Sequence, residues 1–158
     1  GRMAFTIAGD GDFLMNGQEL ATAVQHGART LIVLLNNGMY GTIRMHQERD
    51  YPGRVVGTQL KNPDFAMYAK AFGGHGERVE RTEEFAPAFE RALASGKPAI
   101  LHCIIDPRAI SVGKDFVPAV YTNGREFINI TSDFGFTSSV LCILCNVGSN
   151  GRIRECKM

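Results

Sequence analysis

Two short polar motifs in this chain carry side chains that could bind a metal ion together with a phosphorylated ligand. The first is Gly9-Asp10-Gly11, and the second is Asn36-Asn37, which follows after the 24 residues numbered 12–35. Asp10 offers an anionic oxygen and Asn37 a neutral amide oxygen. Hard oxygen ligands of this kind suit Mg²⁺, which keeps phosphate oxygens or waters in its octahedral shell. The residue types therefore indicate a clamp for Mg²⁺ and a diphosphate.

The glycines of the first motif and the segments that follow both motifs could bring main-chain N–H groups to a phosphate. Glycine on each side of Asp10 allows a sharp turn and a close approach. A helix that begins near Gly17, and a second that begins from Tyr40 onward, would offer free N–H groups and a positive dipole end. Neither the Walker A motif nor the dinucleotide fingerprint fits, because no Gly-Lys-Ser/Thr follows the turn and the third glycine is out of place.

Apolar runs that precede the two motifs predict the strands that must position them. Strands are expected at residues 3–8, 31–35, 77–80 and 99–105, and the run at 31–35 is continuously hydrophobic, as in a strand covered on both faces. Helical patterns lie between these runs, so the chain is expected to form an α/β fold with a parallel sheet and right-handed crossovers. Open sheets of this kind bind ligands at the carboxyl ends of their strands, and the two motifs should therefore meet there.

Helix starts are expected where a capping residue precedes an apolar face. Asn16, with Glu19 three residues later, is typical of a cap with its reciprocal partner. The segment Asn62-Pro63-Asp64 is typical of a helix start. Thr82 is expected to cap a further helix, whose first turn is acidic. The three helices are expected to end at Gly27, Gly73-Gly74 and Gly96.

Composition limits the classes of protein to which the chain can belong. A length of 158 residues, 44% hydrophobic, 21% charged and a net charge of +1, fits one globular domain with a sizeable core. The near-neutral balance predicts no nucleic acid and no anionic membrane surface as partners. No apolar run is long enough to span a bilayer and no secretory signal opens the sequence, so we expect a cytoplasmic location.

The character of the sequence changes after about Asp106. Residues 1–107 carry the α/β pattern and are expected to form the domain, whereas 108–158 form a tail of unassigned structure. The tail could be a poorly ordered extension, a hairpin region or sequence foreign to the domain. Three of the four cysteines lie in it, and a single Cys-x-x-Cys favours small apolar thiols over a zinc or redox site.

The positions of the histidines predict different roles. His46 has a position suited to substrate contact. His102, in an apolar strand, is typical of a core histidine with satisfied hydrogen bonds. His75 lies between two glycines and is expected in a loop.

The two motifs and their spacing resemble the diphosphate-binding signature of thiamine diphosphate-dependent enzymes. The surrounding residues, from about Met3 to Pro107, resemble the carboxyl-terminal domain of the acetolactate synthase and benzoylformate decarboxylase group. The resemblance implies a Rossmann-like, three-layer, parallel-sheet fold, which we expect to be incomplete at its N-terminus because the chain opens directly before a strand. It also implies thiamine diphosphate and Mg²⁺ as cofactors.

The resemblance further implies a role for individual residues. Mg²⁺ would be held by Asp10, Asn37 and the main-chain carbonyl of Met39, and Ile43 would line the reaction pocket, with Arg44 and His46 nearby. The cofactor-binding residues implied in this way are Gly9, Asp10, Gly11, Asp12, Asn37, Met39, Tyr40, Gly41 and Ile43. No residue of this chain is assigned a catalytic role.

The chemistry implied by the resemblance is the cleavage of a 2-keto acid next to its carbonyl, by a decarboxylase or carboligase of the lyase or transferase class. The cofactor's thiazolium carbon supplies nucleophile and electron sink, the protein supplies orientation and electrostatics, and Mg²⁺ anchors the diphosphate. The family activates the cofactor with a glutamate on a pyrimidine-binding domain of the same or a partner subunit. A homo-oligomer is therefore expected for the full-length protein.

Two departures from the family pattern leave alternatives open. The chain is too short to hold the pyrimidine-binding domain, so we expect a fragment that binds the cofactor weakly and turns over little. Met45-His46-Gln47 stands where acetolactate synthases typically carry Gln-Trp-Gln, which leaves a related decarboxylase, carboligase or lyase open. A non-catalytic α/β module for another phosphorylated ligand, or a structural remnant, also fits the residues.

Overall fold

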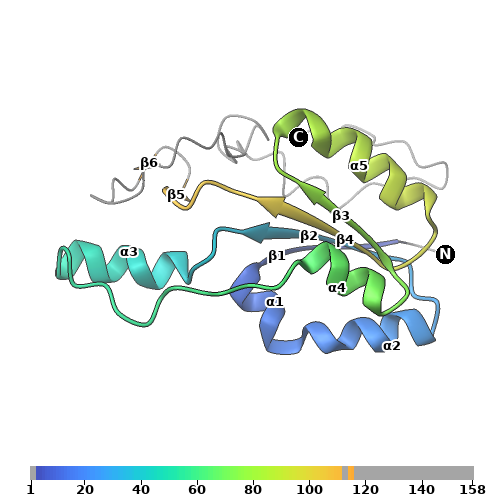
Figure 1. The fold of residues 1–158 in the computed structure, drawn as a ribbon, viewed down its shortest axis with the longest axis horizontal. Coiled ribbons are helices and arrows are strands. Elements are labelled where there is room, and N and C mark those ends of the chain that lie inside the picture. The colour runs from blue at the N-terminus through green and yellow to red at the C-terminus, as the bar shows by residue number, and fades with distance from the viewer. Residues whose placement is uncertain (1–2, 112–113, 116–158) are drawn as a thin grey trace, which may run out of the picture.

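The structure is a computed structural model that describes residues 3–111 and 114–115 of the chain (Figure 1). Four parallel strands form one sheet in the order β1-β2-β4-β3. Their bounds are Ala4–Gly9 for β1, Thr30–Asn36 for β2, His75–Val79 for β3 and Ala99–Ile104 for β4. The expected α/β class and parallel sheet are therefore confirmed.

Helices cover both faces of this sheet and make it the middle of three layers. In Figure 1, α5 lies on one face, and α1, α2 and α4 lie on the other. The helices span Asp10–Asn16 (α1), Leu20–Gln25 (α2), Gly41–Asp50 (α3), Phe65–Ala71 (α4) and Thr82–Ala94 (α5), with a 3₁₀ turn at Gly17–Glu19 between the first two. The helix α3 extends beyond the carboxyl ends of the strands, the edge at which open α/β sheets bind ligands.

Each face of the sheet has its own apolar core. Under α5, the buried side chains are Leu31, Val79, Ala88, Ala92, Ala99, Leu101, Cys103 and Ile105. Under α1, α2 and α4, they are Phe13, Leu20, Leu34, Phe65, Ala69 and Ile100. Side chains of successive strand residues point to opposite faces, so neighbouring positions of β2 and β4 supply different cores.

A helical segment follows Asn16 as expected, formed by the 3₁₀ turn Gly17–Glu19 and α2, but an earlier helix was missed. The chain enters α1 at Asp10, directly after β1, and not after a turn. The Asp12 carboxylate accepts a hydrogen bond from the Gly9 N–H at 3.3 Å, and two acids in the first turn favour the positive helix end. The Asn16 side chain makes no capping hydrogen bond, and Glu19 instead accepts from the Thr22 hydroxyl at 3.0 Å.

The expected helix start at Asn62-Pro63-Asp64 is confirmed. Asp64 is the N-cap of α4, and its carboxylate accepts from the N–H groups of Ala66 (2.8 Å) and Met67 (3.0 Å). Although partial burial opposes it, these hydrogen bonds hold the pKa of Asp64 below its usual value. A local capping pattern was sufficient to predict this helix.

His75 lies in a strand and not in the expected loop. The strand β3 begins at His75, and its next residue packs tightly against the main chain of α4, since a Cβ added to Gly76 would clash with the Ala66 carbonyl oxygen. Long-range packing of this kind has no local sequence signal beyond the glycine itself.

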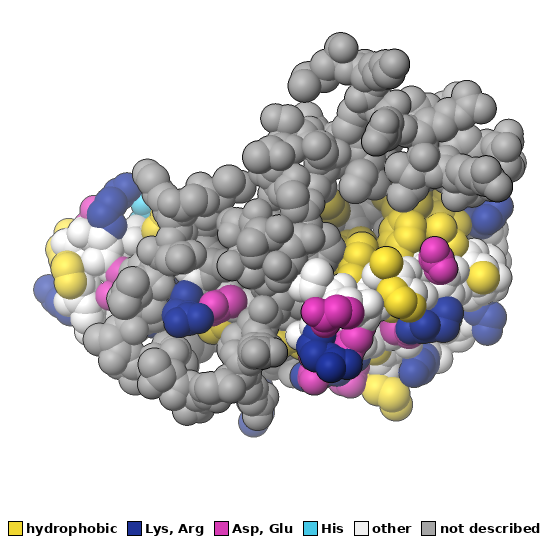
Figure 2. Space-filling model, turned by 90° about the horizontal axis from the view of Figure 1, so that it is seen from above, with side chains coloured by type: hydrophobic (Ala, Val, Ile, Leu, Met, Phe, Trp, Pro, Cys, Tyr) yellow, Lys and Arg dark blue, Asp and Glu magenta, His cyan; other side chains and the backbone are white. Residues whose placement is uncertain are grey.

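Thr82 is the first residue of α5 and not its cap. The N-cap is Arg81, and the Glu84 carboxylate accepts from the N–H groups of Glu80 (3.0 Å) and Arg81 (3.3 Å). Basic and acidic side chains intermingle on the face of the molecule shown in Figure 2. Ion pairs such as Arg91 with Glu77, at 2.6 Å, link these charges between elements.

Two further strands, β5 (Ala109–Ser111) and β6 (Lys114–Asp115), pair antiparallel beyond the sheet. The rest of the expected tail, with Cys142, Cys145 and Cys156, lies outside the described residues. Cys103 is a free, buried thiol, and burial raises its pKa to about 12. Within residues 3–111 and 114–115, no helix is both long and apolar enough to cross a membrane.

Candidate functional site

The two polar motifs meet at the carboxyl edge of the sheet. Asp10, the first residue of α1, is only 3% exposed. Its Oδ2 accepts a hydrogen bond from the Gly38 N–H at 2.9 Å, and its Oδ1 accepts from the Gly11 N–H at 3.0 Å. A buried carboxylate costs free energy unless N–H groups or a cation compensate its charge, and both oxygens here have such donors.

The loop after β2 is held in a defined shape. Gly38 has φ of 71°, a left-handed conformation that glycine adopts without strain. The Asn37 Oδ1 accepts from the Met39 N–H at 3.1 Å. Main-chain hydrogen bonds of 2.8 Å join the loop to a second segment, from the Tyr40 N–H to the Thr58 carbonyl and from the Leu60 N–H to the Gly38 carbonyl. The second motif is thus supported on its far side by residues 58–60.

Two glycines allow close packing in the site. A Cβ added to Gly11 would lie 2.5 Å from the Tyr40 ring, so this glycine lets the first motif approach the segment after the second. A Cβ added to Gly41 would lie 2.9 Å from the Asn37 amide nitrogen, within that same segment. Real Cβ atoms do not approach so closely, so a side chain at either position would require its neighbour to shift.

Asn62, from the segment before α4, is a member of the site that sequence reasoning missed. Its Nδ2 lies 2.5 Å from the Asp10 Oδ2 and 2.8 Å from the Asn36 Oδ1. The sequence signal at Asn62 was interpreted only as part of a helix start. Its partner Asp10 is 52 residues away along the chain, so no local pattern reveals the contact.

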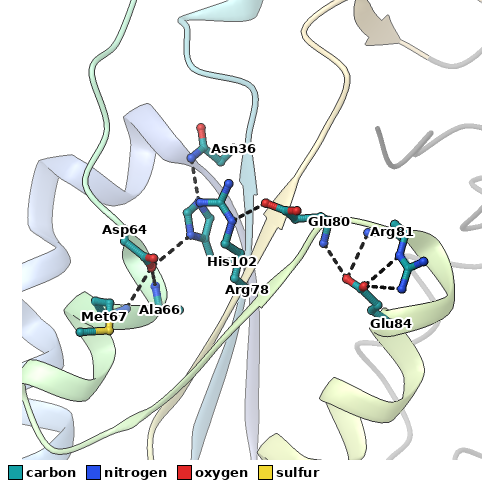
Figure 3. Close-up of polar contacts among 9 residues, drawn as sticks. All are labelled: Asn36, Asp64, Ala66, Met67, Arg78, Glu80, Arg81, Glu84 and His102. Atoms are coloured by element: carbon teal, nitrogen blue, oxygen red, sulfur yellow. Dashed lines mark hydrogen bonds and ion pairs between the residues drawn. The ribbon is translucent and has the colours of Figure 1, made fainter. Parts of the chain in front are cut away.

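His102, on β4, connects the site to the sheet (Figure 3). It is 1% exposed, with its Nε2 2.8 Å from the Asn36 Nδ2 and its Nδ1 3.6 Å from the Asp64 Oδ1. Burial lowers the pKa of His102, as does the charge of Arg78, whereas the charges of Asp64 and Asp10 act in the opposite direction. His102 is buried as expected, but its hydrogen bonds are not all satisfied, because its Nδ1 has no hydrogen-bond partner among the described residues. It is also part of the polar network of the site.

A cavity of about 320 Å³ opens beside this network. It is lined by polar groups of both the second motif and the start of α4, among them Asn37, Asn62, Asp64 and His102. A larger, mostly apolar cavity of about 450 Å³ lies between β1, β2, α1 and α2, and of the predicted residues it includes only Asp12. The smaller cavity is therefore the one lined by the second motif.

The remaining predicted residues lie around the start of α3. Met39 is buried, at 7% exposure, with its sulfur 3.8 Å from the Arg44 guanidinium, whereas Ile43 is 53% exposed. Tyr40 places its ring against Gly11, and Gly41 is the first residue of α3. His46 is exposed on the same helix. The roles assigned to these residues remain predictions.

The donor set offered by the site is mixed. Among the residues that the structure describes, no group of three or more His, Cys, Asp or Glu could hold a metal ion. The predicted set instead combines one carboxylate, one side-chain amide and one main-chain carbonyl. Oxygen donors of these types, completed by phosphate or water, fit the coordination preferences of Mg²⁺.

Comparison with known proteins identifies the family. Residues 1–103 match the family model described as "Thiamine pyrophosphate enzyme, C-terminal TPP binding domain". The chain belongs to this family. Its resemblance to thiamine diphosphate-dependent enzymes is thus confirmed, and the chain contains the TPP-binding domain of enzymes related to acetolactate synthases and decarboxylases.

Individual relatives come from both enzyme groups. The acetolactate synthase isozyme 2 large subunit of Escherichia coli (strain K12) is 42% identical over 101 residues, which is 63% of this chain and 18% of that protein. The crystal structure of benzoylformate decarboxylase from Polynucleobacter necessarius matches with a TM-score of 0.62 and 27% identity, over 67% of this chain and 20% of the other.

A second structural relative is the Rhodococcus jostii RHA1 thiamine diphosphate-dependent 4-hydroxybenzoylformate decarboxylase, with a TM-score of 0.62 and 30% identity. It matches over 66% of this chain and 20% of that structure. The chain thus spans about a fifth of the length of these relatives.

Proposed function

We propose that this chain binds Mg²⁺ and the diphosphate of thiamine diphosphate at the meeting point of its two motifs. Asp10, Asn37 and the main-chain carbonyl of Met39 are the proposed ligands of the metal. The observation that carries the proposal is the hydrogen bond of 2.9 Å from the Gly38 N–H to the buried Asp10 carboxylate. It brings together two oxygen-rich segments that are separated by a complete crossover.

Main-chain groups near both motifs are the proposed contacts of the diphosphate. The first N–H groups of α3, from Gly41 onward, have no acceptor within the helix and lie at its positive end. Main-chain atoms at Gly9, Gly11, Asp12 and Tyr40 complete the proposed set. The place of Gly11 beside the Tyr40 ring, at the meeting point of the two segments, supports including both residues in this set.

The activity that we propose for the protein containing this domain is decarboxylation or carboligation of a 2-keto acid. The bound cofactor supplies a carbanion-stabilising thiazolium, and this chain contributes anchoring and orientation. The exposed Ile43 side chain would line the reaction pocket, with Arg44 and His46 nearby. Residues 1–107 are proposed as the cofactor domain.

The partner proposed for this domain is a pyrimidine-binding domain of the same or a neighbouring subunit. It would supply the glutamate that activates the cofactor, in a homo-oligomer in the cytoplasm. Relatives of the chain are described as large subunits of acetolactate synthase, which fits an assembly of several chains. By itself, the chain is expected to bind the cofactor weakly and to have little activity.

Calorimetric titration of the 158-residue chain tests the metal and diphosphate site. Binding of thiamine diphosphate is expected to depend on Mg²⁺, and binding of Mg²⁺ on thiamine diphosphate. Asp10→Ala should weaken binding by more than about 100-fold, since it removes a ligand and not merely an outer partner. Asp10→Asn provides a second variant that keeps the shape of the side chain.

A matched control for the lost charge is Asp50→Ala, at an exposed carboxylate on α3 that forms an ion pair with its neighbour Arg49. This control should bind as the unchanged chain does. Equal affinity in the Asp10 variants and the unchanged chain would overturn the proposal. Preferential binding of a nucleotide, in competition with thiamine diphosphate, would instead support a module for another phosphorylated ligand.

A further inference from the structure

We propose that Asn62 is a positioning residue of the Mg²⁺ site that fixes the orientation of the Asp10 carboxylate. The inference rests on the proposed function, because it assigns Asn62 a role toward the proposed ligand. Its basis is a set of hydrogen bonds in which each group has only one permitted orientation. The argument starts from a main-chain N–H, which can donate but not accept.

The Gly38 N–H fixes the orientation of the Asn36 side chain. It lies 2.9 Å from the Asp10 Oδ2 and 3.0 Å from the Asn36 Oδ1. If the Asn36 amide were turned over, its NH₂ group would face another donor. The Asn36 oxygen must therefore point toward Gly38, and its nitrogen must point away.

The orientation of Asn36 in turn fixes the protonation of His102. The Asn36 Nδ2 can only donate, and it lies 2.8 Å from the His102 Nε2, so this ring nitrogen must accept (Figure 3). The imidazole is then neutral with its proton on Nδ1. This nitrogen lies 3.6 Å from the Asp64 Oδ1 and has no hydrogen-bond partner among the described residues.

Asn62 completes the network from the other side. Its Nδ2 faces two oxygens that both accept, at 2.5 Å from Asp10 and 2.8 Å from Asn36, so it must present its NH₂ group to them. The Asn62 Oδ1 is left buried without a hydrogen-bond partner among the described residues. Because an unpaired buried oxygen costs free energy, the two acceptors must determine the orientation that Asn62 adopts.

As a consequence, the two carboxylate oxygens of Asp10 accept different sets of hydrogen bonds. Oδ2 receives the N–H groups of both Gly38 and Asn62, whereas the hydrogen bond to Oδ1 comes from the adjacent Gly11. Oδ1 is therefore the oxygen with remaining capacity for a cation. Outer partners of this kind orient metal ligands, and their loss typically weakens metal binding by about 10- to 100-fold.

The difference between Mg²⁺ and Ca²⁺ distinguishes positioning from a merely structural role. Mg²⁺ requires near-ideal octahedral geometry, whereas Ca²⁺ tolerates variable ligand positions. Titrations of the full chain with each metal, at saturating thiamine diphosphate, are compared for the unchanged chain, Asn62→Ala and Asp10→Ala. The matched control is Asn16→Ala, at an exposed asparagine whose side chain makes no capping hydrogen bond.

The expected result is that Asn62→Ala weakens Mg²⁺ binding by at least about 10-fold and lowers the Mg²⁺ to Ca²⁺ affinity ratio, while Asn16→Ala changes neither. If Asp10→Ala weakens binding as expected but Asn62→Ala leaves the affinity unchanged, or loses affinity equally for both metals, the role of Asn62 is overturned and the proposed function is not. If Asp10→Ala binds as the unchanged chain does, the proposed function and this inference both fail.

A measurement on the unchanged chain keeps the inference testable if Asn62→Ala does not fold. Long-range ¹H–¹⁵N NMR spectra report which imidazole nitrogen carries the proton. A neutral His102 with its proton on Nδ1 is the expected result. A proton on Nε2 at neutral pH would contradict the orientation of Asn36 and therefore overturn the network through which Asn62 acts.

Discussion

The two faces of the same four-stranded sheet are built differently. Under α5, β4 contributes Leu101 and Cys103 to a core that is apolar throughout. On the opposite face, the alternate positions of β4 are Ile100 and His102, and the apolar packing changes to a polar network toward the carboxyl edge. The comparison indicates that the face under α5 stabilises the sheet, whereas the face under α4 also orients the cofactor site.

His102 marks the boundary between these two kinds of packing. Its ring packs edge-on against Phe65, at 5.2 Å between centroids, while its Nε2 contacts Asn36 of the second motif. A residue one position away on either side would point to the α5 face. Side chains that alternate along β4 therefore pack in the apolar core on one face of the sheet and orient the site on the other.

The largest expected effect is on the apolar face. Leu101→Ala removes a fully buried side chain and should lower the free energy of unfolding by about 2–5 kcal/mol, because a cavity remains. Chemical denaturation measures the change. The Mg²⁺ to Ca²⁺ affinity ratio of the folded protein should stay the same, and a changed ratio would mean that the two faces are not separable.

A smaller effect is expected where the two motifs touch. Gly11→Ala places a Cβ against the Tyr40 ring and should cost about 1–3 kcal/mol of stability through overpacking. In the background of Tyr40→Ala, the same change should cost much less, because the clashing ring is gone. A double-mutant cycle measures this coupling, and additive losses would show that the glycine is not required by Tyr40.

The polar face is tested at His102 by two replacements of different chemistry. His102→Leu leaves the Asn36 NH₂ group without its acceptor and should cost about 1–2 kcal/mol. His102→Gln offers an oxygen in place of Nε2 and should lose less. Thermal denaturation at neutral pH compares the two, and equal losses would argue against an accepting Nε2.

The smallest expected effect is a dependence of stability on pH. The folded-state pKa of His102 lies below its usual value. Below about pH 6.5, the unfolded chain therefore binds more protons at this residue than the folded chain does. Stability should therefore be constant above that pH and fall as the pH decreases toward the folded-state pKa. Groups facing His102 from other elements are Asp64, Arg78 and Asp10.

Denaturation curves of the unchanged chain and His102→Gln, measured between about pH 7 and 5, isolate this contribution. Carboxylates with lowered pKa, such as Asp64 and Glu77, lose their contribution only at lower pH. Identical pH profiles for the two proteins would contradict the assignment to His102.

The sequence predicted those features that depend on local patterns. The apolar runs at β1, β2 and β4 and the cap at Asp64 each have a signal within a few residues. The start of α1 at Asp10 was missed because the helix begins directly after a strand, without a separate capping residue before it. Asp12 accepts the Gly9 N–H there, and the Asn16 side chain, which matched a capping pattern, makes no capping hydrogen bond.

The site was predicted where it uses motif residues and missed where it uses distant ones. The meeting of Asp10 with the second motif followed from parallel strands, whose carboxyl ends lie at one edge. The contacts of Asn62 and His102 depend on how α4 and β4 pack beside that edge. They required the three-dimensional arrangement, because their partners are 52 and 66 residues away.

The central claim is that a carboxylate of the first motif and an amide of the second share one metal ion. A crystal structure of the chain with Mg²⁺ and thiamine diphosphate tests it most directly. The account predicts that side-chain oxygens of Asp10 and Asn37 both lie about 2.0–2.1 Å from a single Mg²⁺ that also contacts the diphosphate. A metal bound by only one of the two side chains, or a cofactor bound elsewhere, would contradict it.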